Sequence, residues 1–309
     1  MLRRFRVAAN GSGSVIFAKV HPVPVSYPGL RAQTIAHLTP LYGEGEARAL
    51  TWYLLEWATD LDRATIVAQM YEPVANEVAA KLEEGTRRVA AGEPVQYVTG
   101  YVDFGPLRIR IGPGALIPRP ETEQLVDDVA RYRKQKLGFN SIRVIDVCTG
   151  SGCIALAYKA LCRGDAVIGI DLSTEALAWA RLNATESKLD VAFQEADATQ
   201  TDTLPDGPFD IILSNPPYVP TADLATLAPN VREHEPHQAL FVPDDDPLRF
   251  YHHLLTYAQR VLTPGGLLAV ELYADYAEQV ATLFTEGGLR TEIREDFAGK
   301  NRFVWAHLE

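Results

Sequence analysis

The sequence predicts an α/β fold: a seven-stranded, mostly parallel sheet with an antiparallel last strand, preceded by a small helical domain. Three observations predict it. From residue 143 onward, apolar runs of strand length alternate with helical patterns, which is typical of a parallel sheet with crossover helices. The last two runs are too close together for a crossover helix, so they should form an antiparallel hairpin. Residues 31–92 show only the helical period.

The composition is that of a globular protein. The chain has 309 residues, of which 47% are hydrophobic, so it can bury a full core, and its length favours two domains over one. No apolar run approaches the roughly eighteen residues of a membrane span. A net charge of −11 argues against a general grip on phosphate backbones, which needs clustered Lys and Arg. We therefore expect neither a membrane nor direct nucleic acid as a partner.

The amino terminus is basic in an otherwise acidic chain. The first 43 residues contain no acidic residue but carry Arg3, Arg4, Arg6, Lys19 and Arg31. We expect residues 1–30 to be a poorly ordered leader; the alternative is an organelle transit peptide, because such peptides are rich in Arg and poor in acid. The three cysteines are too few for a disulfide framework and indicate a reducing compartment. The expected location is the cytoplasm, or the mitochondrial matrix if the leader is a transit peptide.

Two changes of period divide the rest of the chain. Residues 31–92 should form a helical bundle, in which one apolar stripe consists of Val74, Val78, Leu82 and Val89. Residues 93–117 change to a period of two and should form a short β bridge. Residues 118–309 then hold the sheet, whose strands we expect at 143–147, 166–171, 191–195, 210–214, 266–272, 289–294 and 302–307.

A glycine turn follows the first strand of the sheet, in "VIDVCTGSGCIAL". Gly150 and Gly152 allow a ligand to approach the backbone, and the helix that follows offers unpaired N–H groups. Asp171 ends the next strand, where a carboxylate can accept hydrogen bonds from both hydroxyls of an adenosine ribose. The turn also satisfies the dinucleotide pattern G-x-G-x-x-A, so NAD and S-adenosylmethionine both remain possible cofactors at this point.

The far end of the chain separates these two cofactors. An antiparallel final hairpin after a parallel sheet resembles the S-adenosylmethionine-dependent methyltransferase fold, whereas a dinucleotide fold would continue parallel. Asp197, just past the third strand, then fits the adenine edge. The alternative for Asp197 is a turn aspartate that caps the next segment.

The fourth strand ends in "SNPPY", at residues 214–218. In this fold class it lies beside the first strand, so its carboxyl end faces the same crevice as the glycine turn. Prolines fix φ and remove backbone donors, which leaves rigid carbonyls. The Asn215 side-chain oxygen and the Pro216 carbonyl could accept both hydrogens of a planar –NH2 group, with Tyr218 offering a flat face. Such a site needs neither a metal nor a strong base, because orientation and solvent exclusion do the work.

These motifs resemble the HemK/PrmC family, protein-(glutamine-N5) methyltransferases that act on peptide chain release factors. The likeness runs from about residue 31 onward and rests on "GEPVQYVTG", "IPRPETE", "DVCTGSGCIAL", "SNPPYVP", "REHEPHQALF" and "DFAGKNRFV". It implies methyl transfer from S-adenosylmethionine to the glutamine of the Gly-Gly-Gln motif, with residues 31–92 recognising the release factor. The residues after Pro118-Arg119 separate this family from a sister family that methylates a glutamine of a ribosomal protein.

The resemblance also assigns roles to single residues. Cofactor contacts fall on Thr149, Gly150, Ser151 and Gly152 around the methionine part, Asp171 at the ribose, and Asp197 and Ala198 near adenine. Cys148 stands where the family has Gly, next to the methionine end. Asn215 also touches the cofactor, and the glutamine is held by Asn215, Pro216, Pro217 and Tyr218, with Phe104 walling the pocket and Arg119 on the substrate side.

Three other interpretations carry less support. His234 and His237 form an H-x-x-H pair, but Pro236 prevents a regular helix and no further ligand pair is near, so we expect no metal. A nucleic-acid amino-methyltransferase acting on adenine N6 or guanine N2 would normally add a basic recognition region. A catalytically silent adaptor for release factors would have no need of Asn215 and Asp171.

Overall fold

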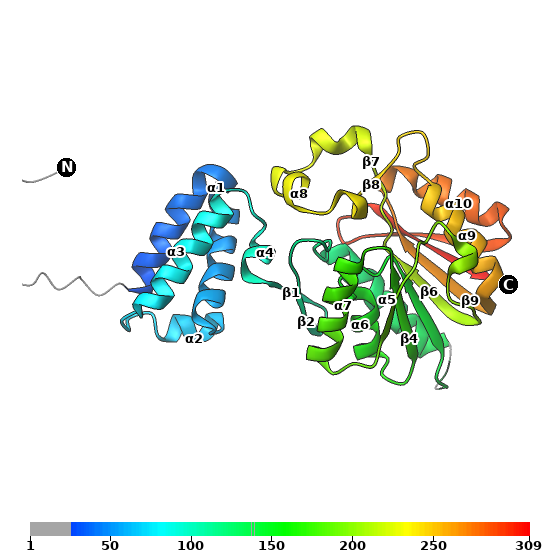
Figure 1. Ribbon diagram of the computed structural model, residues 1–309, viewed down its shortest axis with the longest axis horizontal. Helices are drawn as coiled ribbons and strands as arrows, with labels where there is room; N and C mark the ends of the chain where they lie inside the picture. Colours follow the sequence, from blue (N-terminus) through cyan, green and yellow to red (C-terminus); the bar gives the residue numbers. More distant parts are fainter. Residues whose placement is uncertain (1–25, 137, 139) are drawn as a thin grey trace, which may run out of the picture.

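A computed structural model describes residues 26–136, 138 and 140–309, so most of the expected leader lies outside the described residues (Figure 1). At its centre is a seven-stranded sheet in the order β10-β11-β9-β6-β3-β4-β5. The strands are β3 (Arg143–Val147), β4 (Ala166–Asp171), β5 (Ala192–Glu195), β6 (Phe209–Ser214), β9 (Leu262–Glu271), β10 (Leu289–Glu295) and β11 (Asn301–Leu308). The predicted fold class is confirmed.

Strand direction follows the sequence prediction. The neighbours β4–β5, β3–β4, β3–β6 and β6–β9 pair in parallel. The last strand, β11, is antiparallel to both of its neighbours, β10 and β9. Because β6 pairs with β3 on one side and with β9 on the other, the carboxyl ends of these three strands meet at one edge of the sheet.

Helices cover both faces of the sheet, as a doubly wound fold requires. One face packs against α5 (Pro120–Lys136), α6 (Cys153–Leu161) and α7 (Thr174–Ser187), and the other against α9 (Arg249–Val261) and α10 (Ala277–Glu286). The two faces enclose two separate apolar cores, with Tyr158 and Trp305 buried in the first and Tyr251 and Phe284 in the second.

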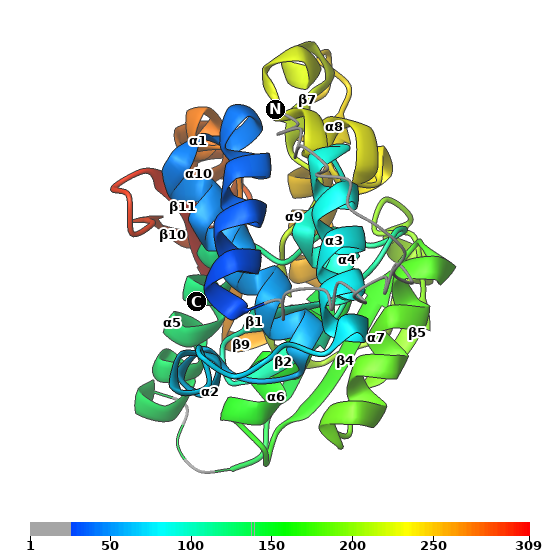
Figure 2. The same ribbon diagram turned by 90° about the vertical axis from the view of Figure 1, so that its left-hand side faces the viewer.

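The helical region precedes the sheet and has its own core. It consists of α1 (Tyr27–Thr59), α2 (Arg63–Ala68), α3 (Asn76–Ala90) and α4 (Val95–Thr99). Of the predicted apolar stripe, Val74, Leu82 and Val89 are buried and Val78 is half-buried. Helix α1 is broken at Gly43, where φ is +76°. Figure 2 looks from the helical region toward the sheet, so that α1 and α3 lie in front of the sheet.

A short antiparallel hairpin joins the helices to the sheet domain. Its strands are β1 (Tyr101–Phe104) and β2 (Leu107–Arg110), and their inward side chains Val102, Phe104 and Ile109 are buried in the same core as α5 and α6. The preceding helix α4 contributes side chains to the core of the helical region and to the first core of the sheet domain. Val95 and Val98 pack into the helical region, whereas Tyr97 packs under the hairpin and donates its hydroxyl hydrogen to the carbonyl of Ala115 at 2.7 Å. The expected bridge is therefore packed into the core of the sheet domain.

One long excursion leaves the sheet after β6 and lies above its carboxyl edge (Figure 1, yellow). It contains β7 (Val219–Pro220), η2 (Thr221–Thr226), α8 (Pro229–His234), η3 (His237–Ala239) and β8 (Phe241–Val242). The short strands β7 and β8 pair in parallel and tie its two ends together. Among the described helices, none is long and apolar enough to cross a membrane.

Candidate active site

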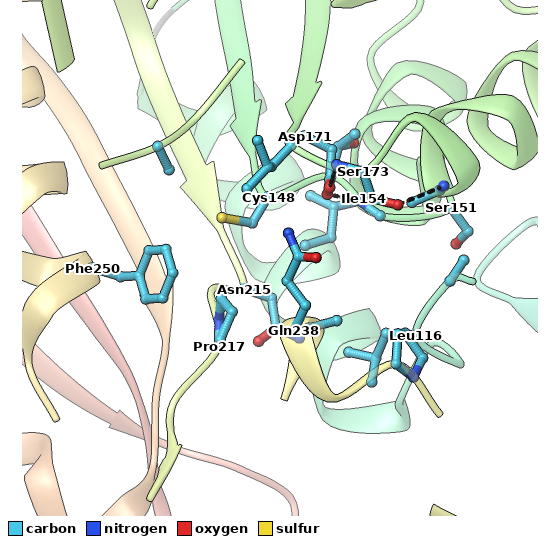
Figure 3. Close-up of a pocket in the computed structure, with 18 of the residues that line it drawn as sticks. Leu116, Cys148, Ser151, Ile154, Asp171, Ser173, Asn215, Pro217, Gln238 and Phe250 are labelled. Atoms are coloured by element: carbon cyan, nitrogen blue, oxygen red, sulfur yellow. Dashed lines mark hydrogen bonds between the residues drawn. The ribbon is translucent and has the colours of Figure 1, made fainter. Parts of the chain in front are cut away.

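A cavity of about 390 Å³ opens at the carboxyl edge of β3, β4 and β6 (Figure 3). Most of the predicted site residues line it. They are Arg119, Cys148, Thr149, Gly150, Ser151, Asp171, Asp197, Ala198, Asn215 and Pro217. The topology explains this meeting, because ligands of open α/β sheets bind where neighbouring strands end and their connections diverge.

The turn after β3 bends through three left-handed residues. Cys148, Gly150 and Gly152 have φ of +62°, +55° and +80°. A Cβ at Gly152 would lie 2.9 Å from the Phe193 ring, so this glycine allows close packing, and it does not line the cavity. A Cβ at Gly150 would meet nothing within 4 Å, so this glycine faces open space.

Asp146, inside β3, holds the turn from below. Its Oδ2 accepts hydrogen bonds from the Thr149 hydroxyl at 2.5 Å and from the Ala155 backbone N–H at 3.1 Å. Burial raises the pKa of Asp146 to about 7. A buried carboxylate with two such donors joins the turn to the first turn of α6 and fixes the backbone that lines the cavity.

Asp171 ends β4 opposite the glycine turn. Its Oδ2 accepts from the Gly150 N–H at 2.8 Å and its Oδ1 from the Ser173 N–H at 2.8 Å. Burial raises the pKa of this carboxyl above its ordinary value. Each oxygen keeps a free acceptor site, which is what two hydroxyls of one ribose would need.

Asp197 follows β5 and serves the local turn while lining the cavity. Its Oδ1 accepts from the Thr199 N–H at 2.8 Å and the Thr199 hydroxyl at 2.7 Å. Burial acts to raise the pKa of Asp197, but the bonds from Thr199 outweigh it and lower the pKa below the ordinary value. Asp197 therefore caps its turn and also lines the cavity, and its contact with adenine stays a prediction.

The segment after β6 divides its residues between the cavity and the layer behind it. The Asn215 Nδ2 donates to the Thr122 hydroxyl oxygen at 3.0 Å, and both residues line the cavity with Pro217. Pro216 is buried and Tyr218 half-buried, and neither lines the cavity. The Tyr218 hydroxyl instead donates to Glu271 Oε1 at 2.9 Å.

Two expected pocket residues need comment. Phe104 is 1% exposed and packs in the apolar core under the β1–β2 hairpin, so it does not wall the cavity as expected. Its strand alternation turns it inward, and the sheet domain rather than the ligand covers it. Arg119 does line the cavity, and its guanidinium pairs with buried Glu235, which also accepts from the Ile117 N–H at 3.0 Å. That pair ties the "IPRPETE" segment to the excursion after β6.

Several residues of the site were not found from the sequence, among them Thr122, Gln238 and Glu271. Thr122 and Gln238 line the cavity, and Gln238 extends from η3 toward Cys148 and Ile154 (Figure 3). Glu271 lies behind Asn215 at the end of β9. One signal could have revealed Glu271: the apolar run "GGLLAVE" ends in a carboxylate at the same edge of the sheet as Asp171 and Asn215. Gln238 gives no such signal, because its loop has no period.

The groups present fit S-adenosylmethionine. Gly150 leaves open space for the backbone approach of a ligand, and Asp171 offers two acceptor oxygens. The Ser151 hydroxyl is buried in the cavity wall without a hydrogen-bond partner among the described residues, so it can bond a ligand. Burial raises the pKa of the Cys148 thiol well above its ordinary value, so the sulfur beside the ligand is a neutral thiol.

Within residues 26–136, 138 and 140–309, no group of three or more His, Cys, Asp or Glu is placed to hold a metal ion. A ring nitrogen of His237 lies 2.7 Å from the Arg232 carbonyl oxygen, within its own loop.

Comparisons with known proteins agree with this geometry. Residues 144–234 match the family "Methyltransferase domain", and residues 30–100 match "PrmC N-terminal domain". Similar proteins include the release factor glutamine methyltransferases of Deinococcus radiodurans, 39% identical over 82% of this chain and 88% of the relative, and of Bacteroides thetaiotaomicron, 37% identical over 74% and 80%. That of Flavobacterium psychrophilum is 32% identical over 89% of this chain and 96% of its own length.

Among solved structures, a ribosomal protein L11 methylase from Lactobacillus delbrueckii aligns with a TM-score of 0.44 and 20% identity, over 65% of this chain and 84% of its own. The sequence relatives decide the family, since they are more than 30% identical and matched over more than two thirds of their length. The chain belongs to the release factor glutamine methyltransferase family.

Proposed function

We propose that this protein transfers the methyl group of S-adenosylmethionine to the side-chain amide nitrogen of a glutamine in peptide chain release factors. By family resemblance that glutamine is the one in the Gly-Gly-Gln motif. The observation that carries the proposal is the position of Asn215, which lines the same cavity as the glycine turn and Asp171. A side-chain amide and the carboxylate proposed to bind the ribose thereby share one cavity.

The chain's own residues orient the acceptor nitrogen. S-adenosylmethionine, when bound, supplies a methyl group on a positively charged sulfur. The Asn215 Oδ1, in the cavity wall, accepts one hydrogen of a planar amide, and the Pro216 carbonyl is the second acceptor expected from the sequence, although Pro216 itself does not line the cavity. Holding both hydrogens directs the nitrogen lone pair toward the cofactor side of the cavity, so rate comes from orientation and exclusion of water.

The direct test combines Asn215→Ala with mass spectrometry of a release factor. Losing one of two positioning bonds should lower turnover by about 10²-fold or more, whereas cofactor affinity should change much less. Asn301→Ala, at the start of β11 and outside the cavity lining, is the matched control and should keep full turnover. A methyl group found on a lysine or a nucleobase, with the glutamine unmodified, would refute the proposal.

We propose further that the substrate is protein and not nucleic acid, and that the enzyme works in the cytoplasm, where it meets release factors. The net charge of −11 supports the first point, as does the pairing of three of the five arginines between residues 31 and 92: Arg48 with Glu44, Arg87 with Glu84 and Arg88 with Glu93. Paired cations are poor contacts for phosphates. Incubation with labelled cofactor and separate protein, DNA and RNA pools should label the protein pool alone.

A further inference from the structure

In the wall of the cavity and the layer behind it, four side chains from three parts of the fold form one hydrogen-bonded series. Asn215 Nδ2 lies 3.0 Å from Thr122 Oγ1, and Thr122 Oγ1 lies 2.6 Å from Glu271 Oε2. On the other side, the Tyr218 hydroxyl lies 2.9 Å from Glu271 Oε1. Thr122 is 2% exposed and Glu271 is 1% exposed, so water cannot substitute for these contacts.

The fold brings these groups together by register. Ser214 of β6 is paired with Val270 of β9, so Asn215, the first residue after β6, follows on beside Glu271, the last residue of β9. Thr122 enters from the first turn of α5. Asn215, Thr122 and Glu271 lie outside the excursion after β6, whereas Tyr218 enters it and donates its backbone N–H to the Leu240 carbonyl at 3.2 Å.

Hydrogen-bond chemistry gives this series a direction. An ionised carboxylate only accepts, so Glu271 takes the single hydroxyl hydrogen of Thr122 and that of Tyr218. Thr122 Oγ1 then has only lone pairs left for Asn215. Asn215 must turn its NH2 toward Thr122, which leaves its carbonyl oxygen as the group available to a ligand in the cavity.

The geometry points to Glu271 as the positioning residue that sets, through Thr122, which end of the Asn215 amide faces the substrate glutamine. This inference rests on the proposed function, because an acceptor oxygen is what an –NH2 substrate needs. If the Asn215 amide were flipped, its NH2 would face the NH2 of the substrate glutamine. Two donors cannot form a hydrogen bond, so the productive complex would be lost. Tyr218 keeps its hydroxyl on Glu271 and so supports the carboxylate.

The surroundings of Glu271 bear on its charge. Burial raises its pKa above the ordinary value; the bonds from Thr122 and Tyr218 and the charge of Arg302 act against this, and Glu121 adds to it. The Arg302 guanidinium is itself held 3.3 Å from Asp296. From α9, Tyr251 donates to the backbone carbonyl of Glu271 at 3.1 Å and leaves the carboxylate free.

Protonation of Glu271 should therefore reverse the donor and acceptor roles along this series of hydrogen bonds. A protonated carboxyl can donate to Thr122, which can then donate to the Asn215 oxygen and turn the NH2 into the cavity. Because the raised pKa belongs to an acid that must be ionised, activity should be present above that pKa and fall as pH drops through it, at higher pH than for an ordinary glutamate.

The first test compares Thr122→Val with Thr122→Ser at saturating cofactor, with methylation of a release factor glutamine as the readout. Valine keeps the shape but breaks the series of hydrogen bonds, so kcat should fall about tenfold while the cofactor Kd is unchanged. Serine keeps the hydroxyl and should restore most of kcat. Equal kcat for the two variants would overturn the inference.

The second test is the pH profile of Glu271→Gln. This variant cannot ionise, and its amide can turn either its oxygen or its NH2 toward Thr122, so the direction of the hydrogen bonds is no longer fixed. It should lack the acid limb seen in the unaltered enzyme and have a lower kcat at neutral pH. Tyr218→Phe should move that limb to higher pH, because it removes a donor to the carboxylate. Its control is Tyr257→Phe, which loses another buried phenol bond, to the Pro205 carbonyl at 2.7 Å, and should leave the profile unchanged.

The two levels of proposal fail differently. If the unaltered enzyme does not methylate a release factor glutamine, the proposed function is wrong. If it does, but Glu271→Gln keeps full kcat with the same acid limb, only the positioning role of Glu271 is wrong. Should Glu271→Gln fail to fold, the Thr122 pair still decides the matter.

Discussion

Cys148 shows how one residue can carry strain beside a ligand. Its φ of +62° lies in the left-handed region, where an L-residue other than glycine pays about 1–2 kcal/mol. Its side chain packs against the second core of the sheet domain and also lines the cavity. The structure therefore holds a thiol at a left-handed position in the wall of the cavity.

We predict that Cys148→Gly and Cys148→Val behave differently. Glycine relieves the strain but frees the unfolded chain, effects of about 1 kcal/mol each that nearly cancel, so thermal stability should change little and cofactor affinity should not fall. A β-branched side chain at positive φ is worse tolerated, and Val should lower the unfolding free energy by at least about 1 kcal/mol. Thermal unfolding and calorimetric titration with S-adenosylmethionine would measure both. A valine variant as stable as the unaltered protein would contradict the argument.

At the scale of elements, the turn between β3 and α6 contains two glycines with different structural roles. Gly152 is needed because Phe193 and Ala180 leave no room for a side chain, at 2.9 and 3.1 Å from an added Cβ. Gly150 is bordered by open cavity. The same letter in one motif therefore serves packing at one position and ligand access at the other.

Alanine substitutions should reveal this difference. Gly152→Ala combines backbone strain with overlap and should lower the unfolding free energy by about 1–3 kcal/mol more than Gly150→Ala does. Gly150→Ala should mainly weaken cofactor binding, because its methyl group takes up ligand space. Chemical unfolding and calorimetry on the two variants would check the order, and a larger stability loss at Gly150 would reverse the assignment.

Elements with a clear local sequence pattern could be predicted, and the start of one strand could not. The parallel strands were found because each is an apolar run bounded by turn residues, as β3 and β4 show. Strand β9 begins at Leu262, earlier than the expected residue 266, because "TPGG" indicates a loop, whereas the structure includes it in the strand as an irregular stretch with Gly265 at φ +78°. Asp171 and Asn215 were found because they end strands whose order the fold class dictates.

The site residues that the sequence did not reveal are placed by contacts between secondary-structure elements. The contact of Thr122 with Asn215 and Glu271 needs the register of β9 against β6 and the approach of α5, none of which a single period contains. Phe104 was placed in the pocket wall, but the packing of the hairpin on the sheet domain decides which way its side chain points. Tertiary packing overrides local pattern at such positions.

At the scale of the whole molecule, the hairpin decides where the chain can be divided. Tyr97, Val102, Phe104 and Ile109 belong to the core that α5 and α6 cover. Each buried side chain of this size contributes about 1.5–3 kcal/mol, so losing four is comparable with the total stability of a domain, about 5–15 kcal/mol. A cut within the expected bridge would therefore remove part of the catalytic core.

We predict that a fragment starting at Glu93 folds and binds S-adenosylmethionine like the whole chain, whereas one starting at Ile111 does not fold. The Glu93 fragment should still modify intact release factor poorly, because residues 31–92 are proposed to recognise it. Circular dichroism, calorimetry and mass spectrometry on the two fragments would test each step. Full activity of the Glu93 fragment on intact release factor would remove the recognition role from the helical region.

Helix α4 has a consequence for which release factors the enzyme can serve. Within five residues it presents Val95 and Val98 to one core and Tyr97 to the other, so no slack segment lies between the two halves. In a protein joined in this way, the distance between the helical region and the active site is fixed. We expect it to accept only partners in which the docking surface and the glutamine loop are separated by one matching distance, whatever the sequence in between.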